Sequence, residues 1–317
     1  MKKRSALLLA CLLILAMGIA PSAHAETFLS IATGGTSGTY YPLGGDIANL
    51  FNSTIDGIKA NAQATGGTAE NLRLINAGDA ELGTVQNDVS AYAFEGIDSF
   101  DGEVIDTFSV ITSLYPEVVQ LVARADVGID SIEDLKGKRV SVGAAGSGTY
   151  FNAIHMLEAA GMSLDDIDEQ FLSFSESGDA AKNRQIDAFF CTAGIPNAAI
   201  TELTSGSEAK VIALDGATID AMIAAKPFYV DFTIPGGTYP GIDDDVRTVA
   251  ITALLVCTND LDEDLVYQMT KSLYEKGDEL LTHAKKTEIT LDTALDGVGN
   301  LPIHPGAERY YKEVGLM

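Results

Sequence analysis

The sequence predicts an α/β fold with two lobes, in which mostly parallel sheets are covered by helices. Its apolar residues alternate between strand-like and helix-like spacing along the chain, and alternating strands and helices imply parallel sheets. Two segments, Leu114–Arg124 and Arg247–Thr258, stay extended and apolar for longer, which indicates crossings between lobes. The tetrapeptide Ser-Gly-Thr-Tyr occurs at Ser37–Tyr40 and again at Ser147–Tyr150. Each copy lies between a predicted strand and a predicted helix, so each lobe receives one.

The elements of the first part follow from this alternation. FLSIATG is a predicted strand, and Leu43, Ile47 and Leu50 then form the apolar stripe of a helix. IKANAQA is a second strand, and TGGTAENLRLINAG gives a turn, a capped helix and a terminating glycine. ELGTVQ is a third strand, and NDVSAYAF follows it.

A second strand–helix series begins at Arg139. Its predicted strands, with helices between them, are RVSVGAA, FLSFSE, IDAFFCTAG and KVIALD. After the second crossing segment the chain becomes helical and rich in Leu, Lys and Glu. We therefore expect a discontinuous lobe 1, made of residues 26–122 and 247–317, and an inserted lobe 2, made of residues 123–246.

The N-terminus predicts export. Lys2, Lys3 and Arg4 precede an apolar run, and Ala23-His24-Ala25 has the small-x-small form of a cleavage site. These are the three parts of a secretory signal peptide. Residues 1–25 are thus an expected signal peptide, cleaved after Ala25.

The charge balance excludes two classes of partner. Without the signal peptide, 17 Lys and Arg stand against 45 Asp and Glu, a net charge of −28. A surface this acidic repels nucleic acid and anionic membranes. The cysteines left after cleavage, Cys191 and Cys257, lie in apolar runs, and either two buried thiols or one disulfide fits an exported protein.

The two Ser-Gly-Thr-Tyr turns predict an anion site. A glycine-rich turn that opens a helix directs backbone N–H groups and the positive end of the helix dipole toward a ligand. A third turn, Thr65–Thr68, opens the next helix, and Gln86 ends a strand at the same predicted sheet edge. Ligands of open α/β sheets bind at that edge. Two lobes closing on one small anion is the resulting hypothesis.

Nucleotide binding and catalysis have little support in the sequence. There is no phosphate-binding G-x-x-x-x-G-K-[ST] motif, and neither turn contains lysine. Neither serine turn fits the G-x-S-x-G nucleophile motif, and His155 follows Ser147 too closely along one strand–turn–helix unit to serve as its base. We expect no catalytic residue, no metal and no cofactor.

The chain resembles the TAXI-type solute receptors, the substrate-binding components of tripartite ATP-independent periplasmic (TRAP) transporters. The resemblance covers nearly all of the chain after residue 25 and is carried by GGTSGTYYPLGGDIA, TGGTAENLRLINAGDAELGTVQND, SLYPEVVQLV, SIEDLKGKRVSVGAAGSGT, QIDAFFCTAGIPNAAI, TIPGGTYPG and LPIHPGAERYYKEVG. One departure is AAKNRQIDAFF, where similar proteins have Asp-Gly before Gln-Ile-Asp, and it concerns a turn. The resemblance implies a periplasmic binding protein type II-like fold, two α/β lobes joined by a two-segment hinge with the ligand cleft between them.

The resemblance also implies a function. We expect a monomeric periplasmic receptor that captures a small carboxylate, such as a glutamate-like amino acid, 2-oxoglutarate or another dicarboxylate, for a membrane-embedded TRAP permease. An exported sensory module and a secreted serine hydrolase are the alternatives. The expected ligand contacts are Thr36, Ser37, Gly38, Thr39, Tyr40, Tyr41, Thr68, Gln86, Ser147, Gly148, Thr149, Thr192, Gly194 and Tyr239, together with Arg124, which equally suits support of the hinge.

Overall fold

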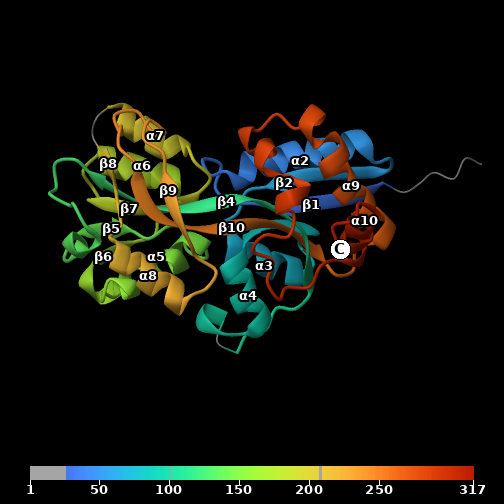
Figure 1. Ribbon diagram of the computed structural model, residues 1–317, viewed down its shortest axis with the longest axis horizontal. Coiled ribbons are helices and arrows are strands. Elements are labelled where there is room, and N and C mark those ends of the chain that lie inside the picture. The colour runs from blue at the N-terminus through green and yellow to red at the C-terminus, as the bar shows by residue number, and fades with distance from the viewer. Residues whose placement is uncertain (1–25, 101, 207–208) are drawn as a thin grey trace, which may run out of the picture.

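A computed structural model of the chain describes residues 26–100, 102–206 and 209–317. The predicted signal peptide lies outside these residues. One mixed sheet of ten strands runs through the molecule, with helices on both faces (Figure 1). Within the described ranges, no helix has the length and apolar character needed to cross a membrane.

The strands follow the order β2-β1-β3-β10-β4-β7-β5-β6, while β8 pairs with β4 and β9 pairs with β10. They are β1 (Thr27–Ala32), β2 (Ile58–Gln63), β3 (Leu82–Gln86), β4 (Phe108–Arg124), β5 (Arg139–Ser141), β6 (Asp168–Gln170), β7 (Ala188–Ala193), β8 (Ala209–Ile212), β9 (Val230–Ile234) and β10 (Val246–Thr258). Strands β1, β2 and β3 are parallel, as are β5, β6 and β7. The parallel strands predicted from the alternation of strands and helices are therefore present as two sets, one in each half of the sheet.

The helices separate into two groups (Figure 1). They are α2 (Tyr40–Thr54), α3 (Thr68–Ala77), α4 (Asn87–Glu95), α5 (Gly148–Ala159), α6 (Phe174–Lys182), α7 (Ala198–Ser205), α8 (Gly216–Ala225), α9 (Glu263–Leu280) and α10 (Pro305–Glu313). Short 3-10 helices are η1 (Asp98–Phe100), η2 (Ile132–Leu135), η3 (Leu164–Asp166), η4 (Ala284–Glu288) and η5 (Leu291–Thr293). Helices α2–α4, α9 and α10 with β1–β3 form lobe 1, and α5–α8 with β5–β9 form lobe 2.

Strands β4 and β10 pair antiparallel and run through both lobes. They are the two long apolar segments of the sequence, and both are almost entirely buried. The predicted lobe boundaries, after residue 122 and before residue 247, fall within them. Register shifts between β4 and β10 at Ala253/Leu254 and Leu255/Val256 interrupt the ladder in its lobe 1 part, where β10 also pairs with β3.

Each lobe has one apolar core on each face of the sheet. In lobe 1, α2, α9 and α10 cover one face, and α3 and α4 cover the other. In lobe 2, α5 and α8 cover one face, and α6 and α7 cover the other. Strand β7, AFFCTA, is almost continuously apolar, because helices cover the sheet on both faces here and every side chain of the strand is buried.

The cysteines lie within these cores. Cys191 in β7 and Cys257 in β10 are free and fully buried. Burial disfavours the charged thiolate and raises the pKa of both thiols. Of the two alternatives left open by the sequence, the structure shows the buried thiols.

One predicted strand is wrong. In FLSFSE, residues 171–173 are a loop and residues 174–176 are the first turn of α6, because Ser173 and Glu176 form a capping box at the helix start. The Ser173 hydroxyl accepts a hydrogen bond from the Glu176 backbone, and the Glu176 carboxylate accepts one from the Ser173 backbone at 2.8 Å. This S-x-x-E pattern was the local signal, and it outweighs the alternating apolar spacing.

Candidate ligand cleft

A cavity of about 70 Å³ lies between the lobes, where the first turn, the third turn and the second turn converge. Strand β1 leads through the first turn into α2, and β5 leads through the second turn into α5. The cavity is lined by Gly34, Gly35, Gly38, Thr39, Tyr40, Thr65, Gly66, Gly67, Thr68, Gln86, Glu117, Ala144, Ser147, Gly148, Thr149, Ser173, Phe174, Thr192 and Ala193. The two Ser-Gly-Thr-Tyr copies therefore face one space.

The first turn both lines the cavity and holds the lobes together. Gly38, Thr39 and Tyr40 border the cavity. The Thr39 hydroxyl accepts a hydrogen bond from the Gly194 backbone of lobe 2 at 3.2 Å. The Ser37 hydroxyl accepts one from the Ser175 backbone, also of lobe 2, at 3.2 Å. The residues on either side of Gly38, Ser37 and Thr39, thus both contact the opposite lobe.

Three predicted contacts of the first turn lie outside the cavity lining. One is Ser37, which is half-buried and whose hydroxyl is bonded to the Ser175 backbone of lobe 2. Thr36 is exposed at the tip of the turn, and Tyr41 is half-buried on α2, one position past the lining residue Tyr40. Consecutive helical positions point about 100° apart, so Tyr40 and Tyr41 cannot both face the cleft.

The second turn contributes Ser147, Gly148 and Thr149 to the lining. Ser147 caps α5, and its hydroxyl accepts a hydrogen bond from the Tyr150 backbone at 3.2 Å. Its own proton stays available to donate. The Thr149 hydroxyl accepts a hydrogen bond from the Thr192 backbone at 3.3 Å, which joins α5 to β7.

The third turn and Gln86 complete the lobe 1 wall. The Thr68 hydroxyl, at the start of α3, accepts a hydrogen bond from the Gln86 backbone at 3.1 Å. The Gln86 side chain lies against Gly148 of lobe 2, where an added Cβ would stand only 1.8 Å from Oε1. Gln86 Oε1 and Thr192 Oγ1 are buried without a hydrogen-bond partner among the described residues. Buried polar atoms in this state point to a ligand, because leaving them unpaired is costly.

Sequence reasoning missed the charged residue of the cavity, Glu117 of β4, which is 2% exposed. The Tyr40 hydroxyl donates a hydrogen bond to its Oε2 at 2.6 Å, and the Tyr115 hydroxyl donates one to its Oε1 at 3.5 Å. Burial, partly offset by the hydrogen bond from Tyr40, raises the pKa of the Glu117 carboxyl to about 8. The available signal was a carboxylate inside the apolar run YPEVVQLV.

Lys285 of η4 lies behind this carboxylate. It is 8% exposed, its ammonium group forms an ion pair with Glu288 at 2.6 Å, and it lies 5.6 Å from the centre of the Tyr115 ring. A Cβ at Gly194 would approach Lys285 Cε to 2.6 Å, so this lysine also contacts lobe 2. Among the described residues that line the cavity there is no lysine or arginine.

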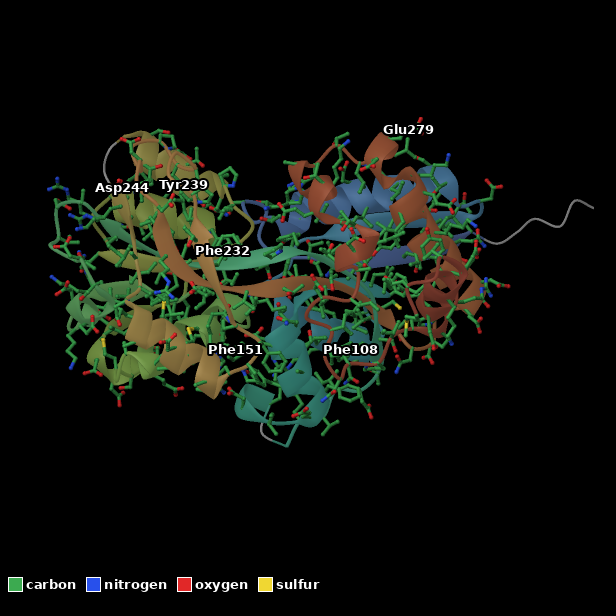
Figure 2. All side chains as sticks on the ribbon, viewed as in Figure 1. Phe108, Phe151, Phe232, Tyr239, Asp244 and Glu279 are labelled. Atoms are coloured by element: carbon green, nitrogen blue, oxygen red, sulfur yellow. The ribbon has the colours of Figure 1, made fainter. Side chains whose placement is uncertain are left out.

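The remaining predicted contacts lie away from the cavity. Arg124 forms ion pairs with Asp126 at 2.7 Å and with Asp187 at 3.6 Å, at the lobe 2 end of β4. The Tyr239 hydroxyl donates to Gln120 and accepts from the Asn197 backbone within the lobe 2 core (Figure 2). Gly194 is next to the lining residue Ala193 and reaches the cleft only through its bond to Thr39.

His155 is not a base for Ser147. Its Nδ1 lies 2.9 Å from the Tyr229 hydroxyl, and its Nε2 lies 3.5 Å from Asp98. Burial lowers the pKa of the His155 imidazole to about 4. Nor do the described ranges contain a group of three His, Cys, Asp or Glu residues that could hold a metal ion.

A second polar cluster joins the lobes beside the cleft. Asn152 of α5 donates to the buried carboxylate of Asp88 of α4 at 2.9 Å, and the Tyr229 hydroxyl donates to the same oxygen at 3.3 Å. Phe151 of α5 packs into the lobe 1 core near Phe100, with ring centres 6.5 Å apart (Figure 2). With the contacts of the turns, this cluster makes the observed arrangement a closed one.

Comparison with known proteins agrees with this architecture. The sequence model of the NMT1-like family matches residues 31–315. A protein from Bordetella bronchiseptica RB50 is similar in structure, with a TM-score of 0.56 and 14% identity over 92% of this chain and 98% of that one.

Two further solved structures are similar at a TM-score of 0.50. The alkanesulfonate-binding protein SsuA from Xanthomonas axonopodis pv. citri, bound to MOPS, shares 17% identity over 91% of this chain and 84% of that one. The ligand-binding component of an ABC-type import system from Staphylococcus aureus, with zinc bound, shares 10% identity over 92% and 93%. At such identities the likeness shows the fold alone, and it confirms the predicted two-lobe, substrate-binding-protein fold class.

Proposed function

The chain belongs to the NMT1-like family, and we propose that it is an extracytoplasmic solute-binding receptor, not an enzyme. Its ligand is a small carboxylate, and its partner is a membrane-embedded permease of the TRAP type. The receptor acts as a monomer in the periplasm after cleavage at Ala25. The TAXI-like segments and the signal-peptide pattern of the sequence support this assignment.

The observation that carries the proposal is the convergence of three helix N-termini on one cavity. Gly38–Tyr40, Thr68 and Ser147–Thr149 lie at the starts of α2, α3 and α5. The first N–H groups of a helix have no partner within the helix. Each hydrogen bond to a charged ligand contributes roughly 1.5–3 kcal/mol and each helix terminus about 0.3–2 kcal/mol. A few such contacts reach micromolar affinity, about 8 kcal/mol, without an arginine.

Binding is coupled to closure because each lobe supplies part of the lining. A ligand that contacts Thr39 and Thr68 of lobe 1 reaches Thr149 of lobe 2 only when the lobes are together. The cavity of about 70 Å³ is small beside the roughly 150 Å³ that holds benzene. A ligand of the size of glutamate therefore needs Gln86 to rotate or the lobes to stand slightly further apart.

The test is a thermal-shift screen of the mature protein against amino acids, 2-oxo acids and dicarboxylates, followed by calorimetry. We expect at least one small acid to raise the midpoint of unfolding by binding the folded state. The variant with Ser147→Ala and Thr149→Ala then weakens that acid by roughly tenfold to a few hundredfold, because two hydroxyl contacts are lost.

A cap elsewhere serves as the control. Ser147→Ala also removes a helix cap, at a cost of about 1 kcal/mol of stability. Asp262→Ala removes the cap of α9, where the carboxylate accepts a hydrogen bond from the Leu265 backbone at 3.1 Å, far from the cleft. It is expected to lower stability similarly and to leave affinity unchanged. No shift with any acid, or equal affinity in the double variant, would overturn the proposal.

A further inference from the structure

The cavity contains two opposite chemistries. Helix N-termini and the hydroxyls of Thr39, Thr68 and Thr149 line part of it, and these groups favour a negative charge. Glu117 lines another part and places a carboxyl group, 2% exposed, against the same space. A ligand that carries only carboxylates would satisfy the first part and would offer no cation to the second.

The surroundings of Glu117 fit the ionised form when a cation is near. Both of its oxygens accept hydrogen bonds from tyrosine hydroxyls, at 2.6 Å from Tyr40 and 3.5 Å from Tyr115. Two donors from the protein prepare a carboxylate, and a third donor from the ligand completes it. The described lining holds no lysine or arginine, and Lys285 behind it is paired with Glu288 at 2.6 Å, so a cation inside the cavity would come from the ligand.

We propose that Glu117 is the binding site of a protonated amino group, so that the ligand is a zwitterionic α-amino acid and not an amine-free dicarboxylate. This inference rests on the proposed function, since it assumes that a small carboxylate occupies the cleft. The α-carboxylate then lies at the helix N-termini, and the ammonium group donates to Glu117. Glu117 thereby determines specificity at the α-carbon.

A consequence is that binding releases a proton. The groups that face Glu117 are Tyr40 of α2, Asp88 of α4, Tyr115 of β4, Cys191 of β7, and Lys285 and Glu288 behind Tyr115. Without a ligand, burial keeps the pKa of Glu117 near 8, so the carboxyl is mostly protonated at pH 6–7. An ammonium group beside it favours the carboxylate and lowers that pKa. Affinity for an amino acid therefore increases between pH 6 and pH 8.

The test uses matched ligand pairs that differ only at the α-carbon: L-alanine with pyruvate, L-aspartate with oxaloacetate, and L-glutamate with 2-oxoglutarate. Calorimetry in buffers of different ionisation enthalpy counts the protons exchanged. We expect one amino acid to bind more tightly than its oxo acid, with close to one proton released at pH 6.5. The proton count requires no variant, so it stands even if a substitution impairs folding.

Substitution then assigns the effect to Glu117. Glu117→Gln keeps the shape and removes the charge, and we expect it to weaken the amino acid by about tenfold to a hundredfold while its oxo acid is not weakened. Glu308→Gln is the control, because it neutralises a carboxylate of α10 that pairs with Lys312 at 2.6 Å outside the cavity lining, and it should change neither affinity. Proton uptake with tighter binding of the oxo acid would mean that a protonated Glu117 donates to a carboxylate, and would overturn the inference.

The remaining outcomes separate the inference from the proposed function. If oxo acids bind and amino acids do not, the receptor function stands and the ammonium site is wrong. Unchanged amino-acid affinity in Glu117→Gln would likewise leave the receptor function standing and refute the ammonium site. If no member of any pair and no other acid binds, the proposed function fails first, and the ammonium site fails with it.

Discussion

Gly148 offers a way to block closure without unfolding the protein. It is the first residue of α5 and lies in lobe 2, directly against the Gln86 side chain of lobe 1. A Cβ at this position would stand 1.8 Å from Gln86 Oε1 and 2.1 Å from its Cδ. Such separations are far below van der Waals contact, so Gly148→Ala is incompatible with the observed arrangement unless Gln86 moves.

The cost falls on the closed form alone. Gly148 has no left-handed backbone conformation, so alanine is compatible with the start of a helix. Overpacking of a tight contact costs about 1–3 kcal/mol. Since about 1.4 kcal/mol corresponds to a factor of ten, and the clashing atoms are the flexible end of Gln86, the tightest acid from the screen should bind roughly 5-fold more weakly if this amide turns aside and up to about 150-fold more weakly if it cannot. The ligand-free protein should keep its thermal midpoint within about two degrees if it is open in solution.

Calorimetry measures the affinity, and small-angle scattering with and without ligand measures closure. Gly45→Ala is the matched control, because Gly45 is a helical glycine of α2 with no atom within 4 Å of an added Cβ. This control should raise stability by about 0.5–1 kcal/mol and leave affinity unchanged. Adding Gln86→Ala to Gly148→Ala removes the clash and should restore closure. Wild-type affinity in Gly148→Ala would refute the reasoning.

Three further predictions concern groups outside the cavity. Burial raises the pKa of Asp88 to about 6, so the folded state binds its proton more tightly than the unfolded state does. Relative to Asp88→Asn, the wild type should lose about 2 kcal/mol of unfolding free energy as pH rises from about 4 to 6, measured by urea denaturation at each pH, and parallel curves would contradict this. Arg124→Ala should lower stability because it removes one of the cations paired with Asp187. Ligand affinity, measured by calorimetry, should stay unchanged, and a loss of affinity would place Arg124 in the site. Cys191 and Cys257 should react with a thiol reagent only as fast as the protein unfolds, and rapid labelling of the native protein would disprove their burial.

Local chemistry explains why much of the fold could be predicted. The apolar spacing of residues 28–86 indicated β1, α2, β2, α3 and β3, because these periods depend only on neighbouring residues. The glycine-rich turns were predictable for the same reason, since a turn into a helix is specified within a few positions. FLSFSE failed because a capping box and an alternating pattern overlapped, and the box prevailed.

The membership of the cavity was less predictable. Thr36 and Tyr41 belong to the same turn as Thr39 and Tyr40, yet they point elsewhere, since the direction of each side chain depends on the path of the backbone. Arg124 and Tyr239 found partners within lobe 2. The place of Glu117 in the cavity could not be predicted from its neighbours in the strand, because its partner Tyr40 lies 77 residues away in the sequence.

Composition and contacts within a few residues are enough to specify the alternation of strands and helices, the acidic surface, the predicted export signal and the two Ser-Gly-Thr-Tyr turns, so all of these can be read from the chain alone. Folding in three dimensions is needed to bring both turns to one cavity, to set Gln86 against Gly148, and to place a buried carboxylate in the same space as three helix N-termini. These features depend on how β4 and β10 carry the chain between lobes. Contacts between distant segments fix them, and no local pattern encodes such contacts.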